Sequence, residues 1–332
     1  MAKRGRARRV SEELFVGIDI GGTKVAAGLV NANGEISSPV RVPMITSGSP
    51  QQGLDSILDA IGRVLPKNSN GIQGIGICSA GPLDPKTGII LNPPNLPCWT
   101  NFPLAESVQK LHTMPVKVDN DANGAALAEA RWGAAAGYGN VFYATLGTGI
   151  GTGIVSNGKI YHGRTGAAGE GGHMSVDYRG PICLCGKPGC IEVYASGNAI
   201  AKRARERVGE GAKSSILDLA GGNVSSVTGE IVAQALNAGD VVAKEIVAER
   251  SEILCVWLSN IIDFQDPEII VIGGGAAVLY RPFLDGIRRR VPELAINPRA
   301  HEVPIVFARY GADSGIAGGA ALCTMGSAAA LA

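Results

Sequence analysis

The chain has 332 residues, of which 45% are hydrophobic and 18% are charged, and its formal net charge at pH 7 is +1. This length allows two domains of roughly 150 residues each, and the hydrophobic fraction excludes global disorder. A net charge so close to zero provides no general attraction to nucleic acid or to membranes. We therefore expect neither a nucleic-acid partner nor a membrane partner.

The two ends of the chain are unusual in composition. Five of the first nine residues are Lys or Arg, and residues 1–13 are predicted to form a disordered basic tail, with a nucleic-acid-binding arm as the alternative. No apolar segment typical of a secretory signal precedes Glu12, so we expect a cytoplasmic protein whose thiols stay reduced. The uncharged segment from Ser314 to Ala332 is rich in small residues, which favours a packed helix over a membrane span.

Two segments of the chain share one pattern. Residues 14–36 and residues 141–160 each contain an apolar run, a glycine-rich turn, a second apolar run and a polar turn. β-Branched and aromatic residues around such turns are typical of antiparallel hairpins. The repeat predicts two related α/β domains.

The rest of the chain alternates between helical and strand patterns. Residues 209–229 are polar and rich in glycine, and we expect a linker-like surface excursion there. A later helix carries an apolar face made of Leu254, Trp257, Leu258, Ile261 and Ile262. The other predicted elements are a helix at 56–65, a buried strand with a small-residue loop within 72–81, a helix from Asp121 that ends at Gly133, and a buried strand with a glycine turn within 267–278.

Strands that alternate with helices indicate α/β layers. We expect a smaller N-terminal α/β domain at residues 14–120 and a larger C-terminal α/β domain, which would contain the cysteine-rich loop, at residues 121–313. A helix at about residues 314–330 is expected to return to the first domain.

Three glycine-rich turns follow apolar strands, at residues 19–24, 146–153 and 273–276. Glycine exposes backbone N–H groups and leaves room for a phosphate group. None of the turns has the P-loop or the dinucleotide-binding spacing, and an ordinary turn is the alternative at each. Asp19 in the first turn can hold a metal ion. The residues there that can donate to phosphate are Gly21, Gly22, Thr23 and Lys24.

Five motifs, taken in order along the chain, resemble those of the ROK family of bacterial sugar kinases, within the actin/hexokinase superfamily. They are FVGIDIGGTK, DNDANGAALAE, GTGIGTGIV, GEGGH and CLCGKPGCIEVYASG. The resemblance implies a two-domain, actin/hexokinase-like (ribonuclease H-like) α/β fold with the active site in the interdomain cleft. PPNLPCWTNFPL and GCIEVYASGNA resemble the glucokinases of the family, although glycine is expected at Cys98, where we expect local packing to differ.

Three cysteines and one histidine are closely spaced. Cys183, Cys185 and Cys190 form a C-x-C-x-x-x-x-C pattern, and His173 lies ten residues before Cys183. Three thiolates and one imidazole complete a tetrahedral site with no position left for water, so we expect a structural Zn²⁺. A reduced loop that binds no metal is the alternative.

The same loop is flanked by two carboxylates. Glu170 lies three residues before His173, and Glu192 lies two residues after Cys190, so a bound metal would also position both glutamates. The resemblance implies that Glu170, His173 and Glu192 bind sugar hydroxyl groups. Taken alone, each glutamate has a solvated surface charge as its alternative.

Phosphoryl transfer to a hydroxyl group needs a base, and a carboxylate can supply it. Spacing alone leaves both Asp119 and Asp121 open as that base. The resemblance assigns Asp121 as the base and Asn120 as a sugar ligand, with a helix N-cap as the alternative role of Asp121. We expect the sugar side to be completed by Ser79, Gly81 and Asn95. We expect the remaining nucleotide contacts to come from Gly147, Thr148, Gly149, Gly274 and Gly275.

Together with the resemblance, these features predict a glucokinase-type hexose kinase of glycolysis, which uses ATP with Mg²⁺ to convert glucose to glucose 6-phosphate and ADP. The alternatives are a kinase for N-acetylglucosamine or N-acetylmannosamine, and a non-catalytic sugar-binding regulator. The family's repressors carry a helix-turn-helix domain before the first glycine motif, and we expect the 13 residues before it here to be too few for one. A homodimer or homotetramer is expected, and polyphosphate stays open as an alternative donor.

Overall fold

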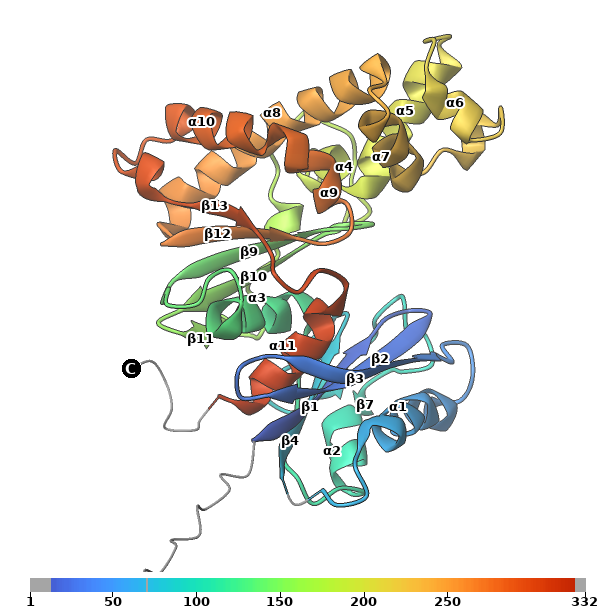
Figure 1. Ribbon diagram of the computed structural model, residues 1–332, viewed down its shortest axis with the longest axis vertical. Coiled ribbons are helices and arrows are strands. Elements are labelled where there is room, and N and C mark those ends of the chain that lie inside the picture. Colours follow the sequence, from blue (N-terminus) through green and yellow to red (C-terminus); the bar gives the residue numbers. More distant parts are fainter. Residues whose placement is uncertain (1–12, 70, 326–332) are drawn as a thin grey trace, which may run out of the picture. The chain divides into compact units, whose positions relative to one another are not determined.

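The computed structural model describes residues 13–69 and 71–325 and divides into two compact units (Figure 1). Among the described residues, the first unit runs to Gly124 and resumes at Asp313, and the second comprises Ala125–Ala312. The basic tail predicted for residues 1–13 lies outside the described residues except for Glu13, as do residues 326–330 of the predicted C-terminal helix.

The first unit is built on a five-stranded sheet of order β3-β2-β1-β4-β8. The hairpin predicted at its glycine-rich turn is confirmed, because β1 pairs with β2 in antiparallel fashion, and β4 pairs in parallel with both β1 and β8. The strands are β1 (Leu14–Ile20), β2 (Lys24–Asn31), β3 (Ile36–Pro43), β4 (Ile72–Ser79) and β8 (Val116–Asn120). The unit also contains α1 (Pro50–Val64), α2 (Leu104–Gln109) and a small sheet of β5 (Leu83–Asp84), β6 (Ile89–Ile90) and β7 (Phe102–Pro103).

Cys98, where the resemblance led us to expect glycine, is buried against α1. A Cβ atom on Gly53 of that helix would lie 3.0 Å from the cysteine sulfur. The neighbouring Trp99 donates its indole N–H to the carbonyl of Pro50 (3.1 Å) and stacks on Phe102 with 5.0 Å between ring centroids. The cysteine therefore fills space between its loop and α1.

The second unit repeats the pairing pattern of the first. Its sheet has the order β11-β10-β9-β12-β13, in which β9–β10 and β10–β11 are antiparallel and β12 is parallel to both β9 and β13. The strands are β9 (Val141–Leu146), β10 (Ile150–Ser156), β11 (Lys159–Ile160), β12 (Ile269–Gly273) and β13 (Ile305–Phe307). The helices are α4 (Glu192–Ala195), α5 (Gly197–Gly209), α6 (Ser215–Leu219), α7 (Gly229–Asn237), α8 (Val241–Gln265), α9 (Ala277–Tyr280) and α10 (Leu284–Leu294).

Two helices each follow the last strand of one sheet and pack against the other sheet. The helix α3 (Asp121–Trp132) follows β8, yet its residues from Ala125 to Ala130 pack with side chains of β9, β10 and β12. The helix α11 (Ser314–Cys323) follows β13, yet it packs against β1 and β4. The chain therefore passes from the first unit to the second within α3 and returns just before α11.

The close packing of α11 on the first sheet requires glycine on both sides. A Cβ atom on Gly17 of β1 would lie 1.8 Å from the carbonyl oxygen of Ile316, and one on Gly76 of β4 would lie 1.7 Å from that of Gly319. These distances are far below van der Waals contact, so no larger residue fits. The packed helix expected from the uncharged C-terminal segment is confirmed for Ser314–Cys323.

Residues 209–229 differ from the linker-like surface excursion that their composition indicated. They contain α6, and Ile216 and Val227 are buried in the core of the second unit. Asp240 fixes the start of α6 by accepting hydrogen bonds from two adjacent serine hydroxyl groups. More than half of these residues are exposed, as expected, but the segment is not a linker, because a few well-placed apolar side chains are enough to dock it on the second unit.

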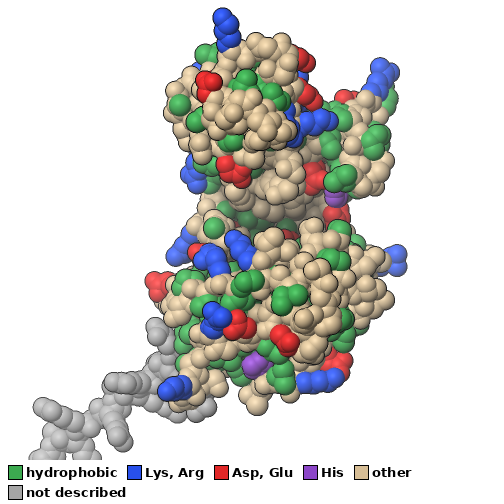
Figure 2. All heavy atoms as spheres, turned by 90° about the vertical axis from the view of Figure 1, so that its right-hand side faces the viewer, with side chains coloured by type: hydrophobic (Ala, Val, Ile, Leu, Met, Phe, Trp, Pro, Cys, Tyr) green, Lys and Arg blue, Asp and Glu red, His purple; other side chains and the backbone are tan. Residues whose placement is uncertain are grey.

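None of the described helices is both long enough and apolar enough to cross a membrane. On the face drawn in Figure 2, Lys and Arg side chains are interspersed with Asp and Glu side chains over each unit. That face therefore carries no broad patch of one charge, in agreement with the net charge of +1.

Candidate functional site

Asp19 lies near the end of β1, beside the glycine-rich turn that leads into β2. Burial, and after it the nearby carboxylate of Asp121, raises the pKa of Asp19 from its ordinary 3.8 to about 6, against the opposite effects of Lys24 and Arg41. At the start of α11, a Cβ atom on Gly315 would lie 2.2 Å from the carboxyl carbon of Asp19. Two neighbouring carboxylates, one of them poorly solvated, form a candidate site for a divalent cation.

The two candidate bases lie on different elements, because β8 ends at Asn120 and α3 begins at Asp121. Asp119 is only 4% exposed and accepts hydrogen bonds from the backbone N–H of Asn120 (2.7 Å) and the side-chain amide of Asn123 (3.1 Å). The side-chain oxygen of Asn120 caps α3, accepting from the backbone N–H groups of Ala122 (2.9 Å) and Asn123 (3.3 Å). Asp121, which also accepts from Ala122 (2.9 Å), is the exposed carboxylate of the two.

The other residues predicted for the sugar side also belong to the first unit. Ser79, at the end of β4, is fully buried and donates to a neighbouring carbonyl (3.2 Å). A Cβ atom on Gly81 would lie 3.7 Å from the amide nitrogen of Asn120, and one on Gly22 would lie 3.3 Å from the backbone oxygen of Asn95. The structure therefore brings Gly81 beside Asn120 and Asn95 beside the first glycine turn, while Ser79 faces inward.

In the second unit, three backbone segments meet around the β9–β10 turn. The N–H of Gly197 donates to the carbonyl of Gly147, and the N–H of Ala276 donates to that of Leu146, both at 2.8 Å. Gly274 has φ +86°, and a Cβ atom there would lie 2.3 Å from the carbonyl oxygen of Leu146. Glycine is therefore required where the turn after β12 approaches the β9–β10 turn.

These segments border a pocket of about 610 Å³ within the second unit, a volume typical of small-molecule sites. Three of the predicted nucleotide ligands line it, namely Gly147, Thr148 and Gly275. The opposite wall was missed from the sequence, because no motif marks it. Arg205 of α5 holds that wall by donating to the carbonyl of Val227 (2.6 Å). The polar residues that the sequence did not point to are Asn198, Ser225, Thr228 and Glu230.

The four predicted metal ligands come together in the second unit. The ligand atoms of His173, Cys183, Cys185 and Cys190 all lie within 4.8 Å of one another. The sulfurs of Cys185 and Cys190 are 3.6 Å apart, and Nδ1 of His173 is 3.6 Å from the sulfur of Cys183. Tetrahedral zinc, with Zn–S of about 2.3 Å and Zn–N of about 2.0 Å, would separate its ligands by roughly 3.5–3.8 Å. These four residues therefore fit a Zn²⁺ ion.

Glu192 connects this cluster with the β9–β10 turn. Its carboxylate accepts hydrogen bonds from the backbone N–H of Ile150 (2.9 Å) and the thiol of Cys183 (3.7 Å). A Cβ atom on Gly149 would lie 2.4 Å from the same carboxylate. In this structure Gly149 makes room for Glu192, a contact that the sequence did not point to.

Glu170 is exposed and comes just before a short 3₁₀ turn, Gly171–His173. Thr152 of β10 accepts a hydrogen bond from the N–H of Gly171 (2.8 Å), and the indole N–H of Trp257 donates to the carbonyl of Gly171 (3.1 Å). The sequence indicated Trp257 only as a core residue, although a buried indole N–H needs an acceptor. The predicted sugar ligands are thus divided between the units, with Glu170, His173 and Glu192 in the second.

Comparison with known proteins gives one consistent result. The model of the ROK family matches residues 15–325. The chain is 36% identical to a glucokinase from Halalkalibacterium halodurans, over 93% of this chain and 94% of the relative. It is 31% identical to an N-acetylmannosamine kinase from Escherichia fergusonii, over 92% of this chain and 96% of that one.

The fold agrees with these relatives. A crystal structure of a ROK family glucokinase from Streptomyces griseus, in complex with glucose and AMPPNP, superposes with a TM-score of 0.80 at 34% identity, covering 93% of this chain and 98% of that one. The two-sheet α/β architecture is accordingly the actin/hexokinase-like fold. The match over residues 15–325 and the similarity of both sequence and structure show that this chain belongs to the ROK family.

Proposed function

We propose that this protein transfers the γ-phosphoryl group of ATP to the 6-hydroxyl group of glucose and releases glucose 6-phosphate and ADP. The observation that carries the proposal is its similarity to the glucokinases of Halalkalibacterium halodurans and Streptomyces griseus over more than nine-tenths of each chain. On the same grounds, the chain is a hexose kinase of the glucokinase type.

Asp121 is proposed as the general base that accepts the proton of the attacking hydroxyl group. It is exposed at the start of α3, whereas Asp119 is buried and already hydrogen-bonded. A base must reach the hydroxyl group of a bound sugar, so accessibility favours Asp121. The proposed sugar ligands are Asn120, Glu170, His173 and Glu192, with Gly81 and Asn95 lining the sugar side. The side chain of Ser79, which was also expected there, is fully buried.

The nucleotide is proposed to occupy the 610 Å³ pocket, which Thr148 and Gly275 line beside two glycine turns. In the first unit, the turn from Gly21 to Lys24 offers further donors to phosphate, and Asp19 would hold Mg²⁺. A carboxyl group whose pKa is raised to about 6 is poorly solvated when charged, and a cation relieves that penalty. Mg²⁺, when bound, neutralises charge on the phosphates. The remaining nucleotide ligands proposed are Gly147, Gly149 and Gly274.

A Zn²⁺ ion is proposed to be held by His173 and the three cysteines in a structural role, since four protein ligands leave no open position. Glu192 follows the proposed ligand Cys190 by two residues, so the metal would support the sugar site by holding the segment that carries this proposed sugar ligand. A cytoplasmic location, a role in glycolysis and a homodimeric or homotetrameric state stay predictions from the sequence.

The second candidate is an N-acetylmannosamine kinase. It is favoured by the 31% identity to the enzyme of that name from Escherichia fergusonii, which also extends over more than nine-tenths of both chains. The two candidates share the base, the nucleotide and the metal, and their sugars differ in both the substituent and the configuration at the second carbon.

A panel of sugars distinguishes these candidates. Turnover of ATP by the purified protein would be measured with glucose, mannose, N-acetylglucosamine and N-acetylmannosamine. We expect glucose to have the highest kcat/KM, at least about tenfold above both N-acetyl sugars, the scale that a few poorly fitting contacts produce. A preference for N-acetylmannosamine would select the second candidate, and binding of sugar without any turnover would select a regulator.

A further inference from the structure

The side chain of Glu129, on α3, is fully buried in the second unit (0% exposed). One carboxylate oxygen accepts hydrogen bonds from the backbone N–H groups of Arg309 (2.8 Å) and Tyr310 (3.1 Å), and the other accepts from that of Ala134 (2.7 Å). Burial of a carboxylate is strongly unfavourable unless its oxygens are hydrogen-bonded, and these three donors satisfy them. The chain therefore keeps a buried, hydrogen-bonded carboxyl group that no step of the proposed reaction uses.

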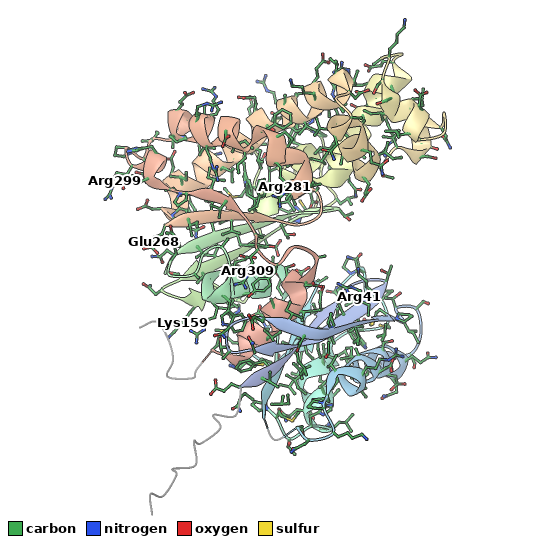
Figure 3. The ribbon with its side chains drawn as sticks, viewed as in Figure 1. Arg41, Lys159, Glu268, Arg281, Arg299 and Arg309 are labelled. Carbon is green, nitrogen blue, oxygen red and sulfur yellow. The ribbon has the colours of Figure 1, made fainter. Side chains whose placement is uncertain are left out.

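The surroundings of Glu129 are shaped to fit it. A Cβ atom on Gly133, directly after α3, would lie 2.1 Å from the Glu129 carboxylate, so this position has no room for a side chain. The guanidinium of Arg309, labelled in Figure 3, lies beside the end of α3 and donates to the carbonyl of Trp132. The segment at 309–310 thus donates both backbone and side-chain hydrogen bonds to the end of α3.

These two segments adjoin the places where the chain passes between the units. The first crossing lies between Gly124 and Ala125, four residues before Glu129, and the second follows Ala312, two residues after Tyr310. We call the chain segments at these two crossings the two connections. The Glu129 carboxylate therefore links them by hydrogen bonds within the second unit.

Of the two carboxylates of the proposed reaction, Asp121 lies on an element that continues from the first connection, and Asp19 contacts an element that continues from the second. Asp121 begins α3, eight residues before Glu129, which is about 12 Å along a helix. The second connection leads directly into α11, where Gly315 packs against Asp19. Because a helix is stiff over such a length, a shift at Glu129 is carried along α3 to Asp121.

We propose that Glu129 is a positioning residue for phosphoryl transfer. By joining the segment at 309–310 to the end of α3, it holds α3, which carries Asp121, and α11, which packs against Asp19, in the register that the reaction requires. The side chain is fully buried and acts only through other residues. This inference rests on the proposed function, in which Asp121 is the base.

Glu268 provides a matched control in the same unit (Figure 3). Its carboxylate also accepts from two backbone N–H groups, those of Gly139 and Asn140, both at 2.7 Å. Neither contact involves α3 or the segment at 309–310. The substitution Glu268→Gln therefore weakens a similar carboxylate clamp without touching either connection.

The test compares the full-length variants Glu129→Gln and Glu268→Gln with the wild type, at a temperature where circular dichroism shows all three to be folded. A small misplacement of a base is expected to lower the kcat of Glu129→Gln about 10- to 100-fold. The Kd of Glu129→Gln for AMPPNP, which the pocket of the second unit is proposed to bind, should change less than about twofold. The kcat of Glu268→Gln should also stay within about twofold of the wild-type value. Hydrogen–deuterium exchange at Arg309 and Tyr310 should be faster in Glu129→Gln alone.

Equal kcat values in all three proteins would overturn the positioning role, as would a loss of kcat matched by an equal loss of AMPPNP affinity. If Glu129→Gln does not fold, Glu129→Asp takes its place, because it keeps the charge but is too short to reach both segments. A wild type that phosphorylates no sugar would overturn the proposed function and the positioning role with it. In that case, faster hydrogen–deuterium exchange at Arg309 and Tyr310 in Glu129→Gln would still show that Glu129 holds the segment at 309–310 against the end of α3.

Discussion

In each unit, three residues join the first two long strands of the central sheet, namely Gly21–Thr23 between β1 and β2 and Gly147–Gly149 between β9 and β10. A backbone hydrogen bond closes each turn, 3.0 Å long in the first and 2.9 Å in the second. The surroundings of the two turns differ. The first is flanked by the charged side chains of Asp19 and Lys24, whereas Glu192 and the start of α5 pack against the second.

This difference shows how one backbone arrangement can serve two tasks. In the first unit the turn lies beside the carboxylates that we propose to hold a cation and to accept a proton. In the second unit the same turn is built into the wall of a pocket and is braced by Glu192 next to the cysteine cluster. The comparison therefore predicts that changes beside the first turn act on turnover, whereas changes in the cluster act on binding.

The largest effect is expected at Asp121. Asp121→Asn keeps the size of the side chain and removes the proton acceptor, so kcat should fall about 10²–10⁴-fold. Binding of glucose, measured by calorimetry, should be nearly unchanged. Asp119→Asn is the control, because the buried Asp119 is hydrogen-bonded within the protein and its loss should lower stability more than turnover. A folded Asp121→Asn variant with near-normal kcat contradicts the assignment of the base.

The next effect is expected at Gly22 in the first turn. A Cβ atom there would lie 3.3 Å from the backbone oxygen of Asn95, so the fold can adjust to Gly22→Val, but its side chain would obstruct the approach of phosphate. We expect kcat/KM for ATP to fall about 100-fold, the scale of a lost donor to a developing charge, with glucose binding retained. Gly62→Ala, at an exposed position with open space around it, should behave as the wild type. Normal turnover by Gly22→Val would show that this turn has only a structural role and does not contact phosphate.

A smaller effect is expected in the second unit when one metal ligand is removed. The wild type should contain about one zinc ion per chain, and Cys185→Ser should release it and weaken glucose binding about tenfold, with AMPPNP binding less affected. Cys98→Ala, a change at a buried cysteine outside the cluster, should keep the metal. Elemental analysis of protein purified without chelator measures the zinc directly, and its absence from the wild type would rule out the metal site.

The last effect concerns stability, with no direct test of turnover, and is expected at Asp19. Its pKa is about 6 in the folded protein and 3.8 ordinarily, so the folded state binds the proton more tightly and loses stability as pH rises from about 4 to about 6. Asp19→Asn removes this penalty, so without Mg²⁺ the variant should be more stable than the wild type at pH 7, by at most about 3 kcal/mol. Urea unfolding midpoints should converge near pH 4. A constant difference at all pH values would show that the carboxyl group does not titrate in this way.

The sequence was most informative where a local pattern carries the information. Both hairpins and the strand within 72–81 follow from apolar runs beside glycine turns, and the structure confirms them. The metal-binding pattern of His173 with Cys183, Cys185 and Cys190 was also visible, because these residues lie within one short segment and the structure brings their ligand atoms together.

Contacts between residues that are far apart in the sequence could not be predicted from local patterns. Glu129 accepts from a backbone group 180 residues away, and no spacing in the sequence points to such a pair. The same holds for α3, which follows a strand of the first sheet but packs on the second, and for the close approach of Gly17 and Gly76 to α11. The part of the pocket wall formed by residues 225–229 was missed because the composition of the segment to which it belongs resembles that of a linker.

The most direct test of the account is the identity of the product that the purified wild type forms from ATP, Mg²⁺ and glucose. Phosphorus NMR of the reaction mixture, with separate quantification of ADP, measures both the position of the new ester and its amount. The account predicts a phosphate ester on the 6-hydroxyl group, formed in equal amount to ADP and only in the presence of a divalent cation. Inorganic phosphate without a sugar ester, or an ester at any other hydroxyl group, would contradict it.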